Sequence, residues 1–333
     1  MPTDNPAPGQ HMAAEAAEAL AVFCKAATKD IRLDAKQPTA IFTIARGSSD
    51  AAANILSYEF MRELQIPVTS LPPSVFSLGD GVSLNGAAAM IVSQSGASDD
   101  LVQSAKGARA GGAAVVAITN HTDSPVQAQS DVTIPIGAGQ ENAVPATKTV
   151  TGSIGAGMAL LAAFKPGYRD KIAGAVDQLR GANVTHPDAH DLRAALLRAR
   201  HVYVIGRDTA FGAAHEIALK LKECCAIHAE AYSSSEVLHG PLQLATNPLM
   251  VLILDNGAPW VQDSLDEAEA RFRQVDCDVH RISPADLGLP QLLPPAAAAV
   301  LLASLYPVIL QTALALGLDP DAPETLSKVT QTT

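Results

Sequence analysis

One stretch of the chain occurs twice, and this repeat limits the possible folds more than any other feature. Residues 41–79 lie over residues 202–240 without a gap, at an offset of 161 residues. Seven positions are identical, and in the first copy they are Ile44, Arg46, Ala52, Ala53, Ile66, Ser74 and Gly79. Two strand–turn–helix units can resemble each other by chance, but agreement over the whole ungapped span argues against chance. We therefore predict two copies of one α/β unit.

Short apolar runs alternate with helical patterns in both halves of the chain. The predicted strands are 40–45, 88–93, 113–119, 131–136, 201–206, 248–254 and 278–283. Strands that alternate with helices are typical of a mostly parallel sheet covered by helices on both faces. The predicted fold class is therefore α/β, with two domains that each form a three-layer αβα structure.

The alternation of strands and helices begins a second time at the predicted strand 201–206, and this divides the chain into domains. A helical pattern over about residues 12–29 precedes the first strand, in what we expect to be an N-terminal helical arm. The expected segments are the arm at 1–30, a first domain at 31–185, a second domain at 186–318 and a tail at 319–333.

The charge of the chain excludes some classes of partner. The formal net charge is −11, and Lys and Arg form no cluster anywhere in the sequence. Nucleic acids and anionic membranes are bound through concentrated positive charge, so neither is an expected partner. A small anion remains possible, because a few local hydrogen-bond donors are enough to hold one.

Three further features favour a soluble cytoplasmic protein without a metal or other cofactor. The four cysteines show no CxxC pair and no spacing typical of metal ligands, so free thiols are expected. The first twelve residues lack the basic and apolar regions of a signal peptide. The apolar run 294–318 is long enough to cross a membrane, but it contains polar residues and a proline. A buried helix is the expected structure of this run.

Polar turns follow two of the predicted strands. They carry the side chains of Ser48, Ser49, Ser93, Gln94, Ser95 and Ser98, and Gly96 lies within the second turn. In a parallel sheet such turns meet the amino ends of helices, where backbone N–H groups stabilise an anion. Helix capping alone would account for one serine in each turn, but not for five. Neither turn matches GxGxxG or a P-loop, so the pattern predicts a phosphate-type anion rather than a nucleotide.

The second copy of the repeat carries charged residues instead of serines. Glu216, Lys220 and Glu223 fall on one face of a predicted helix. An ion-paired, solvated helix face is the ordinary interpretation, but residues 217–221 are apolar apart from Lys220. A largely buried helix is therefore expected. His239 follows in a Gly-Pro turn; a single histidine is usually structural, yet this position also suits an acid or base near pH 7.

These segments together resemble the tandem sugar-isomerase (SIS) proteins. The resemblance rests on SQSGAS, ALKLKE, HAEAY, LHGP and the C-terminal LSKVT, and it runs from about residue 12 to the end of the chain. Within that family the sequence is similar to the isomerase half of glutamine–fructose-6-phosphate transaminase and to glucosamine-6-phosphate deaminases. The resemblance implies two tandem SIS domains.

The resemblance also implies a role for each candidate residue. The five serines and Gln94 would bind the phosphate of a sugar phosphate. Glu223 would move a proton between C1 and C2, supported by Glu216 and Lys220. His239, contributed by the second subunit of a homodimer, would assist ring opening. Lys328 would reach the sugar carbonyl as a Schiff-base-type lysine, and Val144 would line the sugar pocket.

The chain departs from this family in two respects. It lacks the N-terminal glutaminase domain of the transaminase, so release of ammonia from an amino sugar is expected instead of its incorporation. Ala146 stands where the family commonly has serine, and Ala97 where it often has glutamate. The predicted function is a glucosamine-6-phosphate deaminase that forms fructose 6-phosphate and ammonia.

Two alternatives to this function stay open. One is a deaminase or isomerase of another amino-sugar or fructosamine phosphate, or a transaminase-like isomerase without a glutaminase. The other is a sugar-phosphate sensor without turnover, which needs only the serine turns. The presence of Glu223, His239 and Lys328 together disfavours the sensor.

Overall fold

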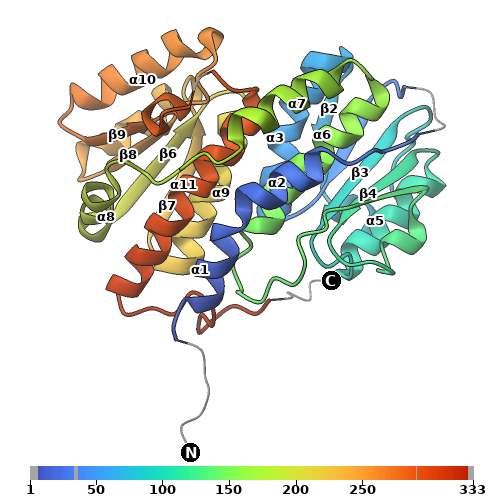
Figure 1. Cartoon of the computed structure of the whole chain (residues 1–333), viewed down its shortest axis with the longest axis horizontal. Helices are drawn as coiled ribbons and strands as arrows, with labels where there is room; N and C mark the ends of the chain where they lie inside the picture. The colour runs from blue at the N-terminus through green and yellow to red at the C-terminus, as the bar shows by residue number, and fades with distance from the viewer. Residues whose placement is uncertain (1–6, 34–36, 290, 329–333) are drawn as a thin grey trace, which may run out of the picture. The chain divides into compact units, whose positions relative to one another are not determined.

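The computed structural model describes residues 7–33, 37–289 and 291–328 (Figure 1). These residues form two compact units. The first-sheet unit comprises residues 20–139 and 149–180, and the second-sheet unit comprises residues up to 19, 140–148 and 181–328. The domain boundaries expected from the sequence remain a prediction.

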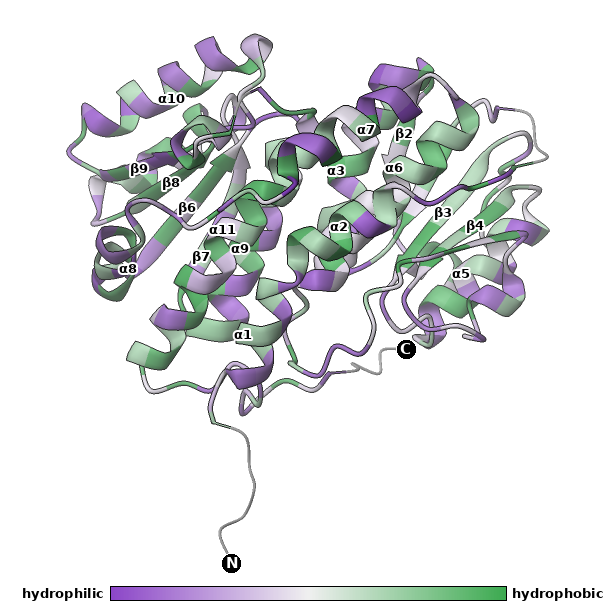
Figure 2. Cartoon of the chain, in the orientation of Figure 1, coloured by the Kyte–Doolittle hydropathy of each residue, from purple (hydrophilic) through white to green (hydrophobic). Residues whose placement is uncertain are grey.

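The first-sheet unit contains a five-stranded parallel sheet in the order β2-β1-β3-β4-β5. The strands are β1 (Ile41–Ile44), β2 (Val68–Ser70), β3 (Ala88–Ser93), β4 (Ala114–Thr119) and β5 (Val132–Pro135). Its helices are α2 (Ala19–Ala27), α3 (Gly47–Leu64), α4 (Ser74–Ser77), α5 (Asp99–Ala110), α6 (Lys148–Phe164), α7 (Tyr168–Leu179) and the short 3₁₀ helix η1 (Gln127–Gln129). Figure 2 shows that the central strands β3 and β4 are apolar, as expected for strands buried on both faces.

Helices cover both faces of this sheet. On one face, α4 and α5 pack on a core that includes Ile91 and Leu101. On the other face, α3 and α6 approach each other closely at Gly157. A Cβ atom at Gly157 would lie 2.2 Å from Leu56 Cδ1, so a glycine is required for this contact.

The second-sheet unit contains a four-stranded parallel sheet in the order β7-β6-β8-β9. The strands are β6 (His201–Gly206), β7 (His228–Ser233), β8 (Met250–Leu254) and β9 (Asp278–Ile282). Its helices are α1 (Gln10–Ala17), α8 (Ala189–Arg198), α9 (Thr209–Cys225), α10 (Gln262–Arg273) and α11 (Pro294–Ala315). Short 3₁₀ helices lie at η2 (Glu236–Leu238), η3 (Pro241–Thr246), η4 (Pro259–Val261) and η5 (Pro284–Leu287).

The two sheets confirm the repeat predicted from the sequence. Strands β1 to β4 correspond in chain order and in sheet order to β6 to β9, and β5 extends only the first sheet. The correspondence continues beyond the aligned span. Gly96 and Gly257 are separated by the same 161 residues, and both have a left-handed backbone, with φ of 61° and 75°. The predicted α/β fold with two helix-covered parallel sheets is therefore confirmed.

The long apolar run forms helix α11. Within the described part of the chain it is the one helix long and apolar enough to span a membrane, and 83% of its most apolar window is buried. Helix α11 packs along α9 and contacts α8 and α1. Its polar Ser304 and Thr312 donate hydrogen bonds back to carbonyl oxygens of the preceding turn. These features are those of a core helix, as the sequence predicted.

Candidate active site

Two polar turns lie at the carboxyl edge of the first sheet. They follow β1 and β3, which are neighbouring parallel strands. The strand order reverses between these two strands, so the turns flank the topological switch point, where α/β sheets bind their ligands. Ser48 and Ser49 lie in the first turn of α3, and Ser98 is the N-cap residue of α5.

Local hydrogen bonds shape the turn after β3. Ser93 Oγ accepts from the backbone N–H of Gly96 at 3.0 Å, and Ser95 Oγ accepts from the N–H of Ala97 at 3.3 Å. A Cβ atom at Gly96 would lie 2.4 Å from Ser124 Oγ, which explains the glycine. Because both serine oxygens act as acceptors here, their O–H groups can donate hydrogen bonds to a ligand.

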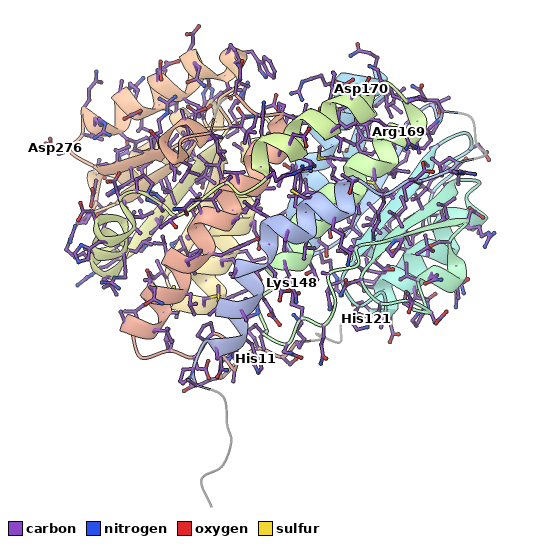
Figure 3. All side chains as sticks on the ribbon, viewed as in Figure 1. His11, His121, Lys148, Arg169, Asp170 and Asp276 are labelled. Atoms are coloured by element: carbon purple, nitrogen blue, oxygen red, sulfur yellow. The ribbon has the colours of Figure 1, made fainter. Side chains whose placement is uncertain are left out.

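Capping does not explain the hydroxyl groups of these turns. Ser98 occupies the N-cap position of α5, yet its side chain makes no capping hydrogen bond. The N-cap residue of α3 is Arg46, which also makes none. Gln94, the remaining predicted residue, has its Nε2 3.3 Å from Nε2 of His121, which Figure 3 labels. The N-cap side chains of both helices therefore make no capping hydrogen bond, although Asp100 Oδ1 accepts from the backbone N–H of Leu101 at 2.9 Å in the first turn of α5. The other N–H groups at these helix ends can stabilise an anion.

A partly buried ion pair connects the two turns, and the sequence interpretation missed it. Arg46 Nε lies 3.0 Å from Asp100 Oδ2, and an Arg46 terminal nitrogen lies 3.0 Å from Asp100 Oδ1. This two-point pair links the start of α3 to the first turn of α5. The charge of Arg46 is thereby neutralised, so the neighbouring donors are hydroxyl, amide and backbone N–H groups. The one available sequence signal was that Arg46 is repeated as Arg207.

A cluster of charges lies on helix α9 in the second-sheet unit. Lys220 Nζ is 3.3 Å from Glu216 Oε1 and 2.6 Å from Glu223 Oε2. The side chains of Glu216 and Lys220 are fully buried, whereas that of Glu223 is 25% exposed. The solvated-face interpretation is therefore wrong, and the buried helix expected from the apolar neighbours is confirmed.

Electrostatics keep the lysine of this cluster charged. Burial alone would lower the pKa of Lys220, because it removes water from the ammonium group. Glu216 and Glu223 outweigh that effect and hold the pKa of Lys220 above its usual range. The cluster therefore consists of a buried ammonium group between a buried carboxylate and one that solvent can reach.

Tyr306 is a buried member of this cluster that the sequence interpretation did not identify. Its hydroxyl group donates to Glu216 Oε1 at 3.4 Å, from helix α11. The pKa of Tyr306 is raised well above its usual value, first by burial and then by the charges of Glu216 and Glu141. Tyr306 thus interacts with two carboxylates, one on α9 and one in the 140–148 loop.

Lys328 contacts the same loop. Its Nζ donates to the carbonyl oxygen of Ala143 at 2.6 Å and lies 3.2 Å from Glu141 Oε2. Glu141 is buried and also accepts from the backbone N–H of Thr147 at 3.0 Å. Glu15, on α1, accepts from the N–H groups of Asn142 and Ala143. Two buried carboxylates therefore hold this loop in place against Lys328.

The structure brings some of the predicted residues together and leaves others apart. Val144, half-buried, directly follows the carbonyl group that Lys328 contacts. His239 is exposed in the turn between η2 and η3, and no hydrogen bond or ion pair of its ring is found among residues 7–33, 37–289 and 291–328. In this same part of the chain, no group of three or more His, Cys, Asp or Glu side chains is arranged to hold a metal ion.

The arrangement suits two kinds of chemistry. The carboxyl edge of the first sheet offers neutral donors and two helix amino ends to a phosphate group. The α9 cluster offers Glu223, an accessible carboxylate backed by a buried ammonium group, which suits proton transfer. Lys328, which pairs with Glu141, offers a donor for a polarised oxygen atom.

Comparison with known proteins agrees with this arrangement. The model of the SIS domain family matches residues 35–163 and 195–273. A glutamine–fructose-6-phosphate aminotransferase of Sulfurisphaera tokodaii is 28% identical over 306 residues, which cover 88% of this chain and 50% of that protein. The chain thus spans about half the length of this relative.

Two solved structures are similar over nearly the whole chain. A protein of Silicibacter pomeroyi DSS-3 described as a phosphosugar isomerase is 31% identical, with a TM-score of 0.81, and the match covers 93% of this chain and 99% of that one. The glucosamine-6-phosphate deaminase of Thermotoga maritima is 18% identical, with a TM-score of 0.76, over 97% of this chain and 100% of that one. The second likeness concerns the fold alone.

Proposed function

Because the chain belongs to the SIS domain family, we propose that it is a glucosamine-6-phosphate deaminase, which forms fructose 6-phosphate and ammonia. The observation that carries this proposal is the cluster of Glu216, Lys220 and Glu223 on α9. A protein that only binds sugar phosphates has no need of a buried lysine between two carboxylates, since burying such charges costs free energy. The cluster therefore favours an enzyme over a sensor.

The proposed reaction begins with binding and ring opening. The serine turns and Gln94 bind the phosphate through hydroxyl, amide and backbone N–H donors. His239 of a second subunit takes the proton of the C1 hydroxyl group and gives a proton to the ring oxygen, which breaks the bond between C1 and the ring oxygen. The product of this step is an open-chain aldehyde with an amino group on C2.

Proton transfer and hydrolysis complete the reaction. Glu223 removes the proton from C2 and returns it to C1, while one proton passes from the C2 amino group to the carbonyl oxygen. The aldehyde thereby becomes an alcohol and the C2 amine becomes an imine. The ammonium group of Lys328 donates a hydrogen bond to the carbonyl oxygen as charge develops on it, a role that its pairing with Glu141 supports. Water then adds to the C2 imine, and ammonia leaves to give the ketone.

The test of this proposal is ammonia release by the full chain. We expect ammonia from glucosamine 6-phosphate, and none from glutamine with fructose 6-phosphate. Ammonia from galactosamine 6-phosphate alone would indicate the other amino-sugar phosphate instead. Binding of both sugar phosphates without any ammonia would support the sensor and reject the enzyme.

Replacing Tyr306 with phenylalanine is expected to lower kcat about tenfold while leaving KM nearly unchanged. The substitution removes one hydrogen bond to the charged Glu216, and such bonds contribute roughly 1.5–3 kcal/mol. Steady-state kinetics of ammonia release, with thermal unfolding of the same sample, would measure this effect.

A matched control exists in the same unit. Tyr232 donates to Glu230 at 2.8 Å on β7, a hydrogen bond that involves no residue of the α9 cluster, and Tyr232→Phe should leave kcat unchanged. Equal kcat values for wild type and Tyr306→Phe would show that this hydroxyl group does not position Glu216 for catalysis.

A further inference from the structure

A cavity opens at the amino edge of the second sheet. Its volume is about 730 Å³, within the range of small-molecule sites. The first residue of every strand of this sheet lines it: His201, His228, Met250 and Asp278. None of the candidate active-site residues contributes to its wall. The cavity is therefore a separate feature, and its role does not depend on the function proposed above.

The wall of this cavity is rich in basic side chains. Arg198 and Arg200, at and just beyond the end of α8, lie beside His201 and His228. The acidic side chains are Asp276, labelled in Figure 3, and Asp278. The carboxylate of Asp278 already has a partner, because its Oδ1 lies 2.9 Å from His280 Nε2.

The two arginines are weakly engaged. Arg198 is 3.8 Å from Asp278 Oδ2, which is a long ion pair between exposed groups and contributes little. Arg200 has no ion pair with any residue that the structure describes. Both guanidinium groups can therefore turn toward a ligand at little cost, and their planar forks suit two-point binding of a phosphate.

The histidine pair adds a hydrogen-bond donor to the wall. Nδ1 of His201 and Nδ1 of His228 are 3.2 Å apart, so one ring donates a hydrogen bond and the other accepts it. The ring that accepts at Nδ1 carries its proton on Nε2, so this N–H group can donate to an anion in the cavity.

Apolar residues form the other part of the wall. Tyr203, Leu249 and Met250 are buried and face the cavity, and Leu244 lies exposed at its margin. We propose that the cavity is a ligand site for a small phosphate monoester, whose phosphate contacts Arg198, Arg200 and the His201–His228 pair and whose carbon skeleton covers the apolar wall. A phosphate ester with an apolar group should accordingly bind more tightly than inorganic phosphate.

The proposal can be tested by NMR of the histidine rings in the full chain. Phenyl phosphate is the probe, and spectra of His201→Gln and His228→Gln identify the two signals. We expect both signals to shift and saturate below about 10 mM probe, with weaker binding of inorganic phosphate and of benzoate. Absence of a saturable shift of these signals up to that concentration would overturn the proposal.

Variants separate this cavity from the serine turns. Arg198→Gln combined with Arg200→Gln should raise the dissociation constant measured on the His201 and His228 signals about tenfold or more. Arg180→Gln, on an exposed helix end, should leave it unchanged. Ser95→Ala combined with Ser98→Ala should also leave it unchanged. Unaltered binding in the double arginine variant would contradict the proposed contacts.

Discussion

Replacing Glu223 with glutamine is expected to lower kcat for ammonia release by a factor of about 10²–10⁴. The amide group has the same shape as the carboxylate but cannot accept the C2 proton. Lys220 keeps its second partner, Glu216, at 3.3 Å, so the fold should be little affected. Steady-state kinetics with glucosamine 6-phosphate would measure the loss.

Deuterium incorporation tests directly whether Glu223 transfers the proton. In deuterium oxide, wild-type protein should place deuterium on C1 of the fructose 6-phosphate formed, and Glu223→Gln should do so only at its reduced rate. Glu267→Gln, at an exposed position of α10 in the same unit, serves as the control and should behave as wild type. Ammonia release by Glu223→Gln at the wild-type rate would remove Glu223 from the proposed role.

The sheets could be predicted from the sequence because their strands are buried on both faces. Such strands appear as continuous apolar runs, and the predicted strands 88–93 and 201–206 coincide with β3 and β6. The ungapped repeat predicted two copies of one α/β unit, and both sheets do place their first strand between their second and third. The strand order itself was not predicted from the sequence.

The helical arm shows what periodicity cannot predict. One helix was expected over about residues 12–29, but the structure has two, α1 and α2, which meet at Glu18. The Glu18 carboxylate lies 2.8 Å from Lys148 Nζ, an ion pair between residues far apart in the sequence. The two helices belong largely to different units. A break set by tertiary contacts leaves no signal in a continuous helical pattern.

The candidate site was predictable only where its residues lie close together in the sequence. Glu216, Lys220 and Glu223 share one helix face, so their spacing predicted their contacts. Tyr306 reaches Glu216 across 90 residues, and Lys328 reaches Glu141 across 187. Pairs this distant in the chain depend on how α11 and the tail pack, which no local pattern reveals.

The repeat also allows the carboxyl edges of the two sheets to be compared position by position. The turn after β8 corresponds to the serine turn after β3, but it carries Asp255 in place of Gln94. Asp255 Oδ2 lies 2.7 Å from Arg281, which also pairs with Asp266 and Glu269. In the second copy, this turn therefore carries a carboxylate that is paired with an arginine. The two copies have diverged, because the turn after β3 carries neutral donors and the turn after β8 carries a charge.

Replacing Lys220 with methionine is expected to destabilise the second-sheet unit by roughly 3–5 kcal/mol. The substitution leaves the fully buried Glu216 without its ammonium partner, and an uncompensated buried charge is costly. Lys222→Met, on the same helix but exposed, is the matched control and should change stability by less than about 0.5 kcal/mol. Urea unfolding followed by circular dichroism would measure both.

A double variant identifies the cause of that loss. If the buried charge of Glu216 is responsible, adding Glu216→Gln to Lys220→Met should recover a large part of the lost free energy of unfolding, because a neutral amide costs less to bury. If the loss came instead from the packing of the lysine chain, the double variant would be no more stable than Lys220→Met. Neither variant should release ammonia at the wild-type rate, since both lack the ammonium group 2.6 Å from Glu223. Stability and activity would thus be separated within one cluster, with the buried pair supporting the fold and Glu223 moving the proton.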